Sequence, residues 1–265
     1  MHPLPYRLAL LAALAFLTVP NVVDAQPSEA DSAADTTVAV EPRFVLRLPH
    51  VTVEPGQMTD TVAVTLATHG AEIAGFDLKI GCDSRLVTIA DVLRGAIPDS
   101  CRWEYFAARD VFQVGAETGP LSLWKVIALA RSTPGGEKPT CFGLDREAGL
   151  VELVLNFNPK AYLEDTTVSL FFYWEDCRDN VLSDKSGSQG MISNRVFDYY
   201  GALTDSLADA FPSRTGTPRQ CVDPARRNHA RRLVDFHNGG ISFPIMLAPD
   251  TIGAAEDRSG VTDSL

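Results

Sequence analysis

The sequence predicts an all-β protein built as an antiparallel β-sandwich. Short runs rich in Val, Phe, Tyr and Trp alternate between apolar and polar residues, which is the period of a half-buried strand. Gly, Pro, Asp and Asn separate these runs, and helical periodicity is weak before residue 200. Many strands at short spacing without helices between them favour two antiparallel sheets packed face to face.

The expected strands begin at Arg43. The clearest of them is residues 75–80, where Phe76, Leu78 and Ile80 share one face and charged residues lie between them. The other alternating stretches are 61–66, 150–157 and 168–175. Each of these strands is expected to turn its apolar face toward the core and its polar face outward.

A β-hairpin is predicted in the middle of the chain. Residues 102–114 and 121–131 flank a turn at 115–120 that contains glycine and proline. The outer ends of the two strands should therefore lie close together.

The region at about 195–232 departs from the strand pattern. Residues 204–211 have the spacing of one or two helical turns, which Pro212 ends, and 224–232 is a basic segment of helical character. Apolar residues return at 233–247. We predict a mixed, partly helical insertion before the last strand.

The first residues have the form of a secretory signal peptide, residues 1–25. Arg7 precedes an apolar run at 8–19, and small residues at Val23 and Ala25 mark a cleavage site after Ala25. The alternative, a membrane anchor, is disfavoured because a spanning helix needs about 20 apolar residues. The mature chain is expected to be secreted by a bacterium, without membrane insertion.

Two further segments lie outside the strand pattern. Residues 26–41 are polar, small and acidic, which indicates a disordered linker. Residues 248–265 form a polar C-terminal tail.

The charge balance limits the classes of partner. Acidic residues outnumber basic ones by 34 to 23, and the net charge is −11. A nucleic-acid binder needs a basic face, and so does a protein that docks on anionic lipid. The composition therefore argues against nucleic acid as a partner.

The chain has five cysteines, and export makes disulfides possible. Because the hairpin ends should meet, we predict a Cys101–Cys141 bridge, and a Cys177–Cys221 bridge would attach the insertion to the sandwich. Cys82 is then the free thiol. Four cysteines allow three pairings, and buried unpaired thiols are the alternative.

The sequence contains no recognisable catalytic motif, and we expect a non-enzyme. Glu175, Asp176, Asp179 and Asp184 form an acidic cluster, whose carboxylate oxygens are the kind of ligand that calcium takes. Their spacing matches no known calcium loop, so a solvated acidic turn is the favoured interpretation. No cofactor or metal site is assigned.

Five aromatic residues in the expected strands are ligand-binding candidates: Trp103, Tyr105, Trp124, Phe171 and Tyr173. The last two fall on the face opposite the core-facing residues of their strand. Exposed aromatic rings on a sandwich stack on sugars or anchor a protein partner. The favoured alternative is that the insertion covers Phe171 and Tyr173 as a second small core.

Several segments together resemble the strands of cohesin modules. They are VEPG at 53–56, DTVAV at 60–64, IAGFDLKI at 73–80, DSRLVTIADV at 83–92 and NGGISF at 238–243. The resemblance spans roughly residues 43–245 and is sharpest at 73–92.

The resemblance implies a jelly-roll β-sandwich over residues 42–247, including the insertion. It also implies a non-catalytic module of a cell-surface or polysaccharide-degrading assembly, whose partner is a dockerin, a small calcium-binding module on another secreted protein. The alternative function is a carbohydrate-binding module that stacks sugars on exposed aromatic rings. The partner is then a polysaccharide instead of a dockerin-type or other secreted protein.

Overall fold

The computed structural model describes most of the chain after residue 43. The residues described are 44–244, except 112–119, 134, 137, 145, 164–165, 205–207, 223–224 and 226–228. The expected signal peptide (1–25), linker (26–41) and tail (248–265) lie outside this part. Within it, no helix has the length and apolar character needed to cross a membrane.

The described residues are nearly all β, as the alternating pattern predicts. The strands are β1 (Phe44–Arg47), β2 (His50–Thr52), β3 (Thr59–Ala67), β4 (Ile73–Asp83), β5 (Val87–Arg94), β6 (Tyr105–Asp110), β7 (Leu121–Leu129), β8 (Ala148–Phe157), β9 (Thr167–Phe172), β10 (Val181–Asp184), β11 (Gly190–Phe197), β12 (Arg231–His237) and β13 (Gly239–Ser242). The helical elements are α1 (Ala96–Ser100) and the 3-10 turns η1 (Pro159–Leu163) and η2 (Arg219–Cys221).

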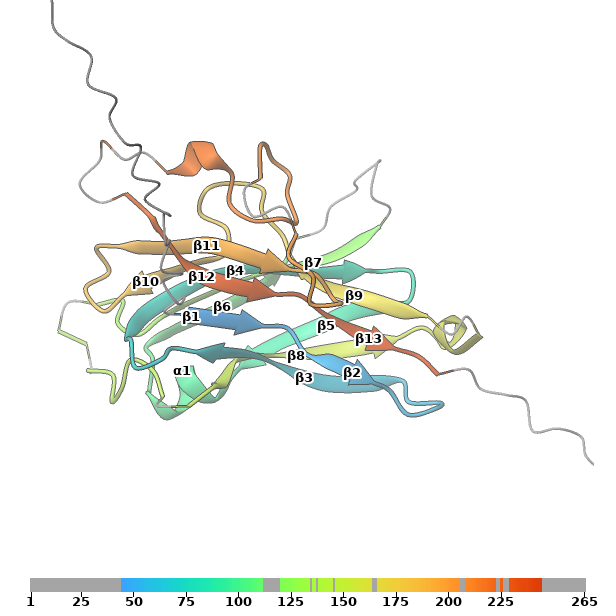
Figure 1. Ribbon diagram of the computed structural model, residues 1–265. Helices are drawn as coiled ribbons and strands as arrows, with labels where there is room; N and C mark the ends of the chain where they lie inside the picture. The colour runs from blue at the N-terminus through green and yellow to red at the C-terminus, as the bar shows by residue number, and fades with distance from the viewer. Residues whose placement is uncertain are drawn as a thin grey trace, which may run out of the picture. The chain divides into compact units, whose positions relative to one another are not determined.

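The strands form two layers, with β3, β8 and β2 below and β4, β10 and β11 above (Figure 1). Pairing runs in the order β2–β13–β9–β4–β10–β11–β12–β1–β3–β8–β5, and β7 followed by β6 lies on the other edge of β4. Strands β10 and β9 occupy successive stretches of the same edge of β4. The predicted β-sandwich is confirmed, and the predicted hairpin is the antiparallel pair β6–β7.

One part of the fold prediction is wrong, because the sheet is mixed and not wholly antiparallel. Strand β12 runs parallel to both β1 and β11, and β13 runs parallel to β2. Parallel neighbours need a crossover of about a dozen residues or more. Residues 198–230 supply that crossover between β11 and β12.

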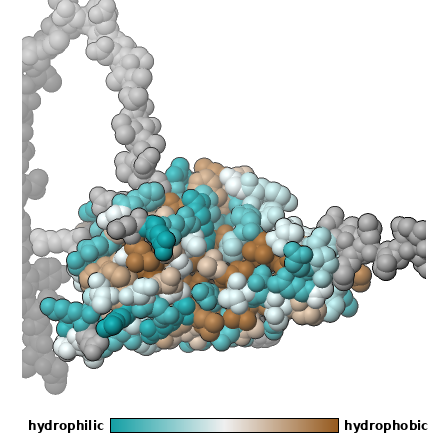
Figure 2. Space-filling view, turned by 90° about the horizontal axis from the view of Figure 1, so that it is seen from below, coloured by the Kyte–Doolittle hydropathy of each residue, from teal (hydrophilic) through white to brown (hydrophobic). Residues whose placement is uncertain are grey.

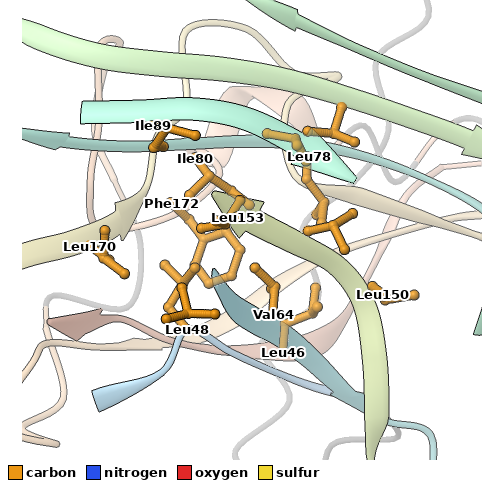
Figure 3. Close-up of a cluster of buried hydrophobic side chains, with 14 of the residues drawn as sticks. Leu46, Leu48, Val64, Leu78, Ile80, Ile89, Leu150, Leu153, Leu170 and Phe172 are labelled. Carbon is orange, nitrogen blue, oxygen red and sulfur yellow. The ribbon is translucent and has the colours of Figure 1, made fainter. Parts of the chain in front are cut away.

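The core lies between the layers and is filled by the inward side chains of nearly every strand. Leu46, Val64, Leu78, Leu153 and Phe172 come from five different strands and meet there (Figure 3). Burying each such side chain stabilises the fold by about 1.5–3 kcal/mol. On the side seen from below, hydrophilic residues separate several smaller apolar areas (Figure 2).

The insertion lies at the top of Figure 1, above β11 and β4. Its described residues include one 3-10 turn, η2, and no α-helix, and the stretches predicted to be helical, 204–211 and 224–232, lie in part outside the described residues. Two strands follow it, β12 and β13, where we predict one. Ser213 forms a β-bridge with Trp174, which fixes the insertion to the end of β9.

The disulfides join the pairs that the sequence predicts. The Cα atoms of Cys101 and Cys141 are 4.7 Å apart, and those of Cys177 and Cys221 are 5.3 Å apart. The two bridges close loops of 40 and 44 residues. In the loop-entropy account, each bridge lowers the entropy of the unfolded chain and so stabilises the fold by about 4 kcal/mol. Cys82 is a buried free thiol. Burial raises its pKa to about 12.

Candidate functional site

The upper sheet has an outer face formed by the side chains that point away from the core. On β4 these are Gly75, Asp77, Lys79, Gly81 and Asp83, because the residues between them enter the core. The antiparallel register places them opposite Leu129, Ile127, Lys125, Leu123 and Leu121 of β7. We call the outward side chains of β6, β7, β4, β10 and β9 the outer face.

One end of the outer face is apolar and open. Ile127, Leu129 and Val181 line a hollow of about 350 Å³ together with Ala230. None of these four side chains is fully buried, and Tyr105 lies beside Leu129 with 42% of its surface exposed. The four form a partly exposed apolar floor.

Two more hollows continue this floor on either side. One of about 620 Å³ shares Leu129 and Ser183 with it and adds Arg131, Lys138 and Lys185. The other, of about 380 Å³, shares its Asp77, Ile127 and Arg178. Because neighbouring hollows share lining residues, the three form one groove across β7, β4 and β10, which we call the groove.

The charged end of the groove is an ion-pair cluster. Lys79 and Lys125 stand side by side on β4 and β7. Lys125 Nζ lies 2.7 Å from Asp77 Oδ1 and also pairs with Asp179. Lys79 Nζ pairs with Glu175 and lies 3.7 Å from Asp179 Oδ2. Two ammonium groups therefore share three carboxylates.

Burial and charge set the protonation of this cluster. Burial raises the pKa of Asp77, and the hydrogen bond from Lys125 opposes that rise. Burial alone would lower the pKa of Lys125, but its hydrogen bonds to Asp179 and Asp77 raise it. Lys125 therefore stays charged, and Asp77 is easier to protonate than an aspartate in water.

The segment between β9 and β10 folds over the cluster and is held there by its own side chains. The carboxylate of Asp179 accepts hydrogen bonds from the backbone N–H groups of Glu175 (2.7 Å) and Asp176 (3.0 Å). Asn180 accepts one from the backbone N–H of Lys79 at 2.8 Å and donates one to the carbonyl of Tyr173 at 2.9 Å. These bonds fix one wall of the groove.

The same contacts use the carboxylates considered for calcium. Glu175 and Asp179 face lysine ammonium groups, and Asp176 pairs with Arg178. Asp184 accepts hydrogen bonds from Ser186 and from backbone N–H groups. No group of three or more metal-ligating side chains occurs in the described residues.

Of the five aromatic candidates, Tyr105 is exposed and borders the groove. Trp103, Phe171 and Tyr173 are all less than 6% exposed. Trp124 is half-buried and donates its indole N–H to the carbonyl of Ile89 at 2.9 Å. Stacking of a ligand on Trp103, Phe171 or Tyr173 requires exposure that the structure does not give them.

Phe171 and Tyr173 do lie on the outer face, as the alternation predicts. They form a second apolar cluster with Leu121 and Leu123. The guanidinium of Arg214, from the insertion, lies 3.9 Å from the centre of the Phe171 ring. The insertion therefore covers them, which is the alternative favoured from the sequence.

Sequence reasoning missed the lysines that form the cluster and the residues that form the floor of the groove. Lys125 stands among apolar residues in β7, and Lys79 shares the outward face of β4 with Asp77; these two positions were the available signal. A lysine at such a position needs an exposed face or a carboxylate partner. The floor residues Ile127 and Leu129 gave no such signal, because they read as ordinary strand residues.

Comparison with known proteins finds matches among solved structures. No family model matches the chain, and no curated protein matches it. Among solved structures, 23 chains match. One is a type I cohesin from Clostridium thermocellum in complex with a dockerin, with 14% identity, 76% of this chain and 98% of that chain covered, and a TM-score of 0.41.

Two more are CaCohA2 from Clostridium acetobutylicum and a type III cohesin from Ruminococcus flavefaciens. They are 13% and 12% identical to this chain and cover 77% of it in both cases. The match spans 92% of the first and 88% of the second, each with a TM-score of 0.42. All three are cohesins. TM-scores below 0.5 leave the likeness at the level of outline.

Proposed function

We propose that this chain is a secreted, non-catalytic module that binds another secreted protein through the groove. The observation that carries the proposal is the groove itself, three joined hollows on an open sheet face. Its apolar floor is bordered by charged side chains on both sides. Protein interfaces combine an apolar centre with a polar rim in this way.

The charges of the groove favour an acidic partner. Arg131, Lys138 and Lys185 line the end farthest from the ion-pair cluster, and Arg131 and Lys138 have no carboxylate within ion-pair distance among the described residues. A module that binds calcium carries carboxylates for that purpose. A basic rim on a chain of net charge −11 suits such a partner.

The resemblance of the sequence to cohesins supports a dockerin-type partner. Its sharpest part, residues 73–92, includes β4, and the outward side chain of Asp77 on β4 lines the groove. The segment that carries the resemblance is therefore also the segment that supports the proposed interface. Such a module would recruit proteins to a cell-surface or polysaccharide-degrading assembly.

The test is capture of a partner and its loss in one variant. The immobilised protein is exposed to the organism's secreted proteins with calcium and with a chelator, and the retained proteins are identified by mass spectrometry. We expect a protein with a dockerin-like module that chelation releases. Ile127→Asp should weaken its binding at least about tenfold, because it places a charge on the apolar floor.

The matched control is Leu93→Asp. Leu93 is exposed on β5, outside the groove, and receives the same substitution. If both variants bind the partner equally well, the groove is not the interface. If no retained protein carries a dockerin-like module, the partner class is wrong.

Secretion is tested separately. The exported protein should have lost residues 1–25, so that its N-terminal residue is Gln26. Intact mass and N-terminal sequencing of protein from the culture medium measure this directly. Recovery of the chain only inside the cell, with Met1 still present, would contradict the proposal.

A further inference from the structure

A second pocket lies between the insertion and the turn that follows β4. It has a volume of about 690 Å³ and shares no lining residue with the groove. Its charged lining residues are Asp83, Arg85, Lys160 and Arg214. We call it the basic pocket.

The insertion positions one wall of this pocket. The backbones of Ser213 and Trp174 exchange two hydrogen bonds of 2.9 Å, so a single β-bridge joins the insertion to the segment that follows β9. The next residue, Arg214, then lies over Phe171, with 3.9 Å between its guanidinium carbon and the ring centre. A cation stacked on an aromatic ring has a defined orientation.

Two positive charges of the pocket form no ion pair among the described residues, although the carboxylate of Asp83 acts on Arg214 electrostatically. Arg85 is neutralised by Asp83, with Nε 3.0 Å from Oδ1 and 2.9 Å from Oδ2. In the described part of the chain, no carboxylate lies within ion-pair distance of Arg214 or Lys160. Burial lowers the pKa of Arg214, so its guanidinium is partly stripped of water. An anionic ligand would compensate that loss.

We propose that the basic pocket binds a saccharide that carries a carboxylate. A guanidinium binds a carboxylate through two parallel hydrogen bonds, and the ammonium group of Lys160 adds a second positive charge. The pocket is far larger than one anion and lies within the size range of small-molecule sites. A uronic acid residue within a longer saccharide fits both features.

The remaining lining favours a saccharide over a peptide. Asn158, Thr166, Thr167 and Ser169 offer amide and hydroxyl groups that both donate and accept hydrogen bonds, as sugar hydroxyls do. Of the apolar lining residues, Leu121, Val168 and Phe171 are each at most 5% exposed, and Leu86 alone among them is partly exposed. A peptide anchor needs a wide accessible apolar surface, and Leu86 by itself offers little of it.

The experiment measures binding of trigalacturonic acid to the purified protein by titration calorimetry at low salt. The methyl ester of the same trisaccharide is the matched ligand, since it keeps the sugar and removes the charge. We expect binding of the acid and at least about tenfold weaker binding of the ester, because a charge-assisted pair is lost. Added salt should weaken binding of the acid.

Variants assign the site. Arg214→Gln and Lys160→Gln should each weaken binding of the acid, the former by at least about tenfold. Lys160 is exposed on η1, so its variant also tests the pocket if Arg214→Gln alters folding. Arg102→Gln makes the same charge change at an exposed residue outside both the basic pocket and the groove, and should bind as the unmodified protein does.

Three results would overturn the proposal. The first is equal affinity for the acid and its methyl ester. The second is the absence of binding at about 1 mM trisaccharide, the weakest affinity of interest. The third is tighter binding of a glutamate-rich peptide that Arg214→Gln and Lys160→Gln also weaken, which would assign the pocket to a protein partner.

Discussion

Replacing Lys125 by methionine tests whether the ion-pair cluster stabilises the fold. Methionine is similar in length but cannot pair with Asp77, whose Oδ1 lies 2.7 Å from Lys125 Nζ, or with Asp179. The carboxylate of Asp179 is only 2% exposed, so water cannot replace the lost ammonium group. Its remaining cation would be Lys79, at 3.7 Å.

The expected loss follows from burial. Removing one partner of a buried pair costs about 3–5 kcal/mol, because the other charge is left uncompensated. The side chains of Lys125 and Asp77 keep 12% and 26% exposure, and Lys79 still faces Asp179. Because these groups are not completely buried and Asp179 keeps one cation, the lower end of this range applies, and we expect a loss of about 3 kcal/mol in the free energy of unfolding.

The assay is thermal and guanidinium unfolding of the purified variant. For a domain of about 200 residues, this loss lowers Tm by roughly 6–12 °C. The control is Arg178→Met, which breaks the ion pair with Asp176, where the two side chains are 85% and 49% exposed. Exposed ion pairs contribute little to stability, so the control should unfold at the same temperature and guanidinium concentration as the unmodified protein.

The comparison of the two variants decides the matter. If Lys125→Met unfolds at the same temperature as the unmodified protein, the cluster does not hold the segment between β9 and β10. If both variants lose the same stability, burial is not what makes the cluster important. Either result would refute the reasoning.

Three further predictions concern ionisation, close packing and the free thiol. Burial raises the pKa of Asp77, so between its pKa in the unfolded chain and its higher pKa in the fold, the folded state binds more protons than the unfolded state. The free energy of unfolding therefore falls as the pH rises through this interval. Asp77→Asn removes this effect, so its stability relative to the unmodified protein should increase from about pH 4 to about pH 7, measured by urea unfolding at each pH; a constant difference would contradict this. Gly239→Ala should lower the free energy of unfolding by about 3 kcal/mol or more, because its Cβ would lie 2.1 Å from the carbonyl oxygen of Pro49. The control is Gly143→Ala, whose Cβ would have its nearest neighbour at 3.5 Å and which should unfold at nearly the same temperature as the unmodified protein. Cys82 has a pKa of about 12 and is fully buried, so it should react with a thiol reagent only as fast as the protein unfolds, and rapid reaction of the native protein would show otherwise.

The alternation of β4 shows how much of the fold the sequence predicts. Phe76, Leu78 and Ile80 enter the core as expected, since strand periodicity fixes the side to which each residue points. It does not fix what lies on the other side. Lys79 points outward, yet its side chain is only 6% exposed, because the segment between β9 and β10 covers it.

The separation of residues along the chain explains which other pairings the sequence predicts and which it does not. The hairpin β6–β7 and the Cys101–Cys141 bridge depend on strands that are neighbours along the chain, so turn residues were sufficient to predict them. Strand β12 lies between β1 and β11, and its pairing with β1 joins residues almost 200 positions apart. No local pattern specifies such a pairing.

The groove was not predicted because its floor is ordinary in sequence. Ile127 and Leu129 alternate with core residues in β7 as any half-buried strand would. They form a site because β6 and β10 leave them partly open, while the insertion covers Phe171 and Tyr173 farther along the same face. The aromatic candidates were chosen by residue type, but coverage by other segments decides which residues can meet a ligand.

The ion-pair cluster lies where this coverage changes. In the register of β4 and β7, the pair Lys79–Lys125 separates Asp77–Ile127 on the open side from Gly81–Leu123 on the covered side. A buried ammonium group between two apolar patches prevents them from merging into one, since it cannot enter either without its carboxylates. The groove and the basic pocket are therefore separate sites on one sheet.

Asp179 fixes the segment that ends at Asn180, whereas Ser213 fixes the wall of the basic pocket that carries Arg214. Lys125→Met should therefore weaken binding at the groove and leave saccharide binding at the basic pocket unchanged. Loss of both activities in a variant that is still folded would show that the two sites are not independent.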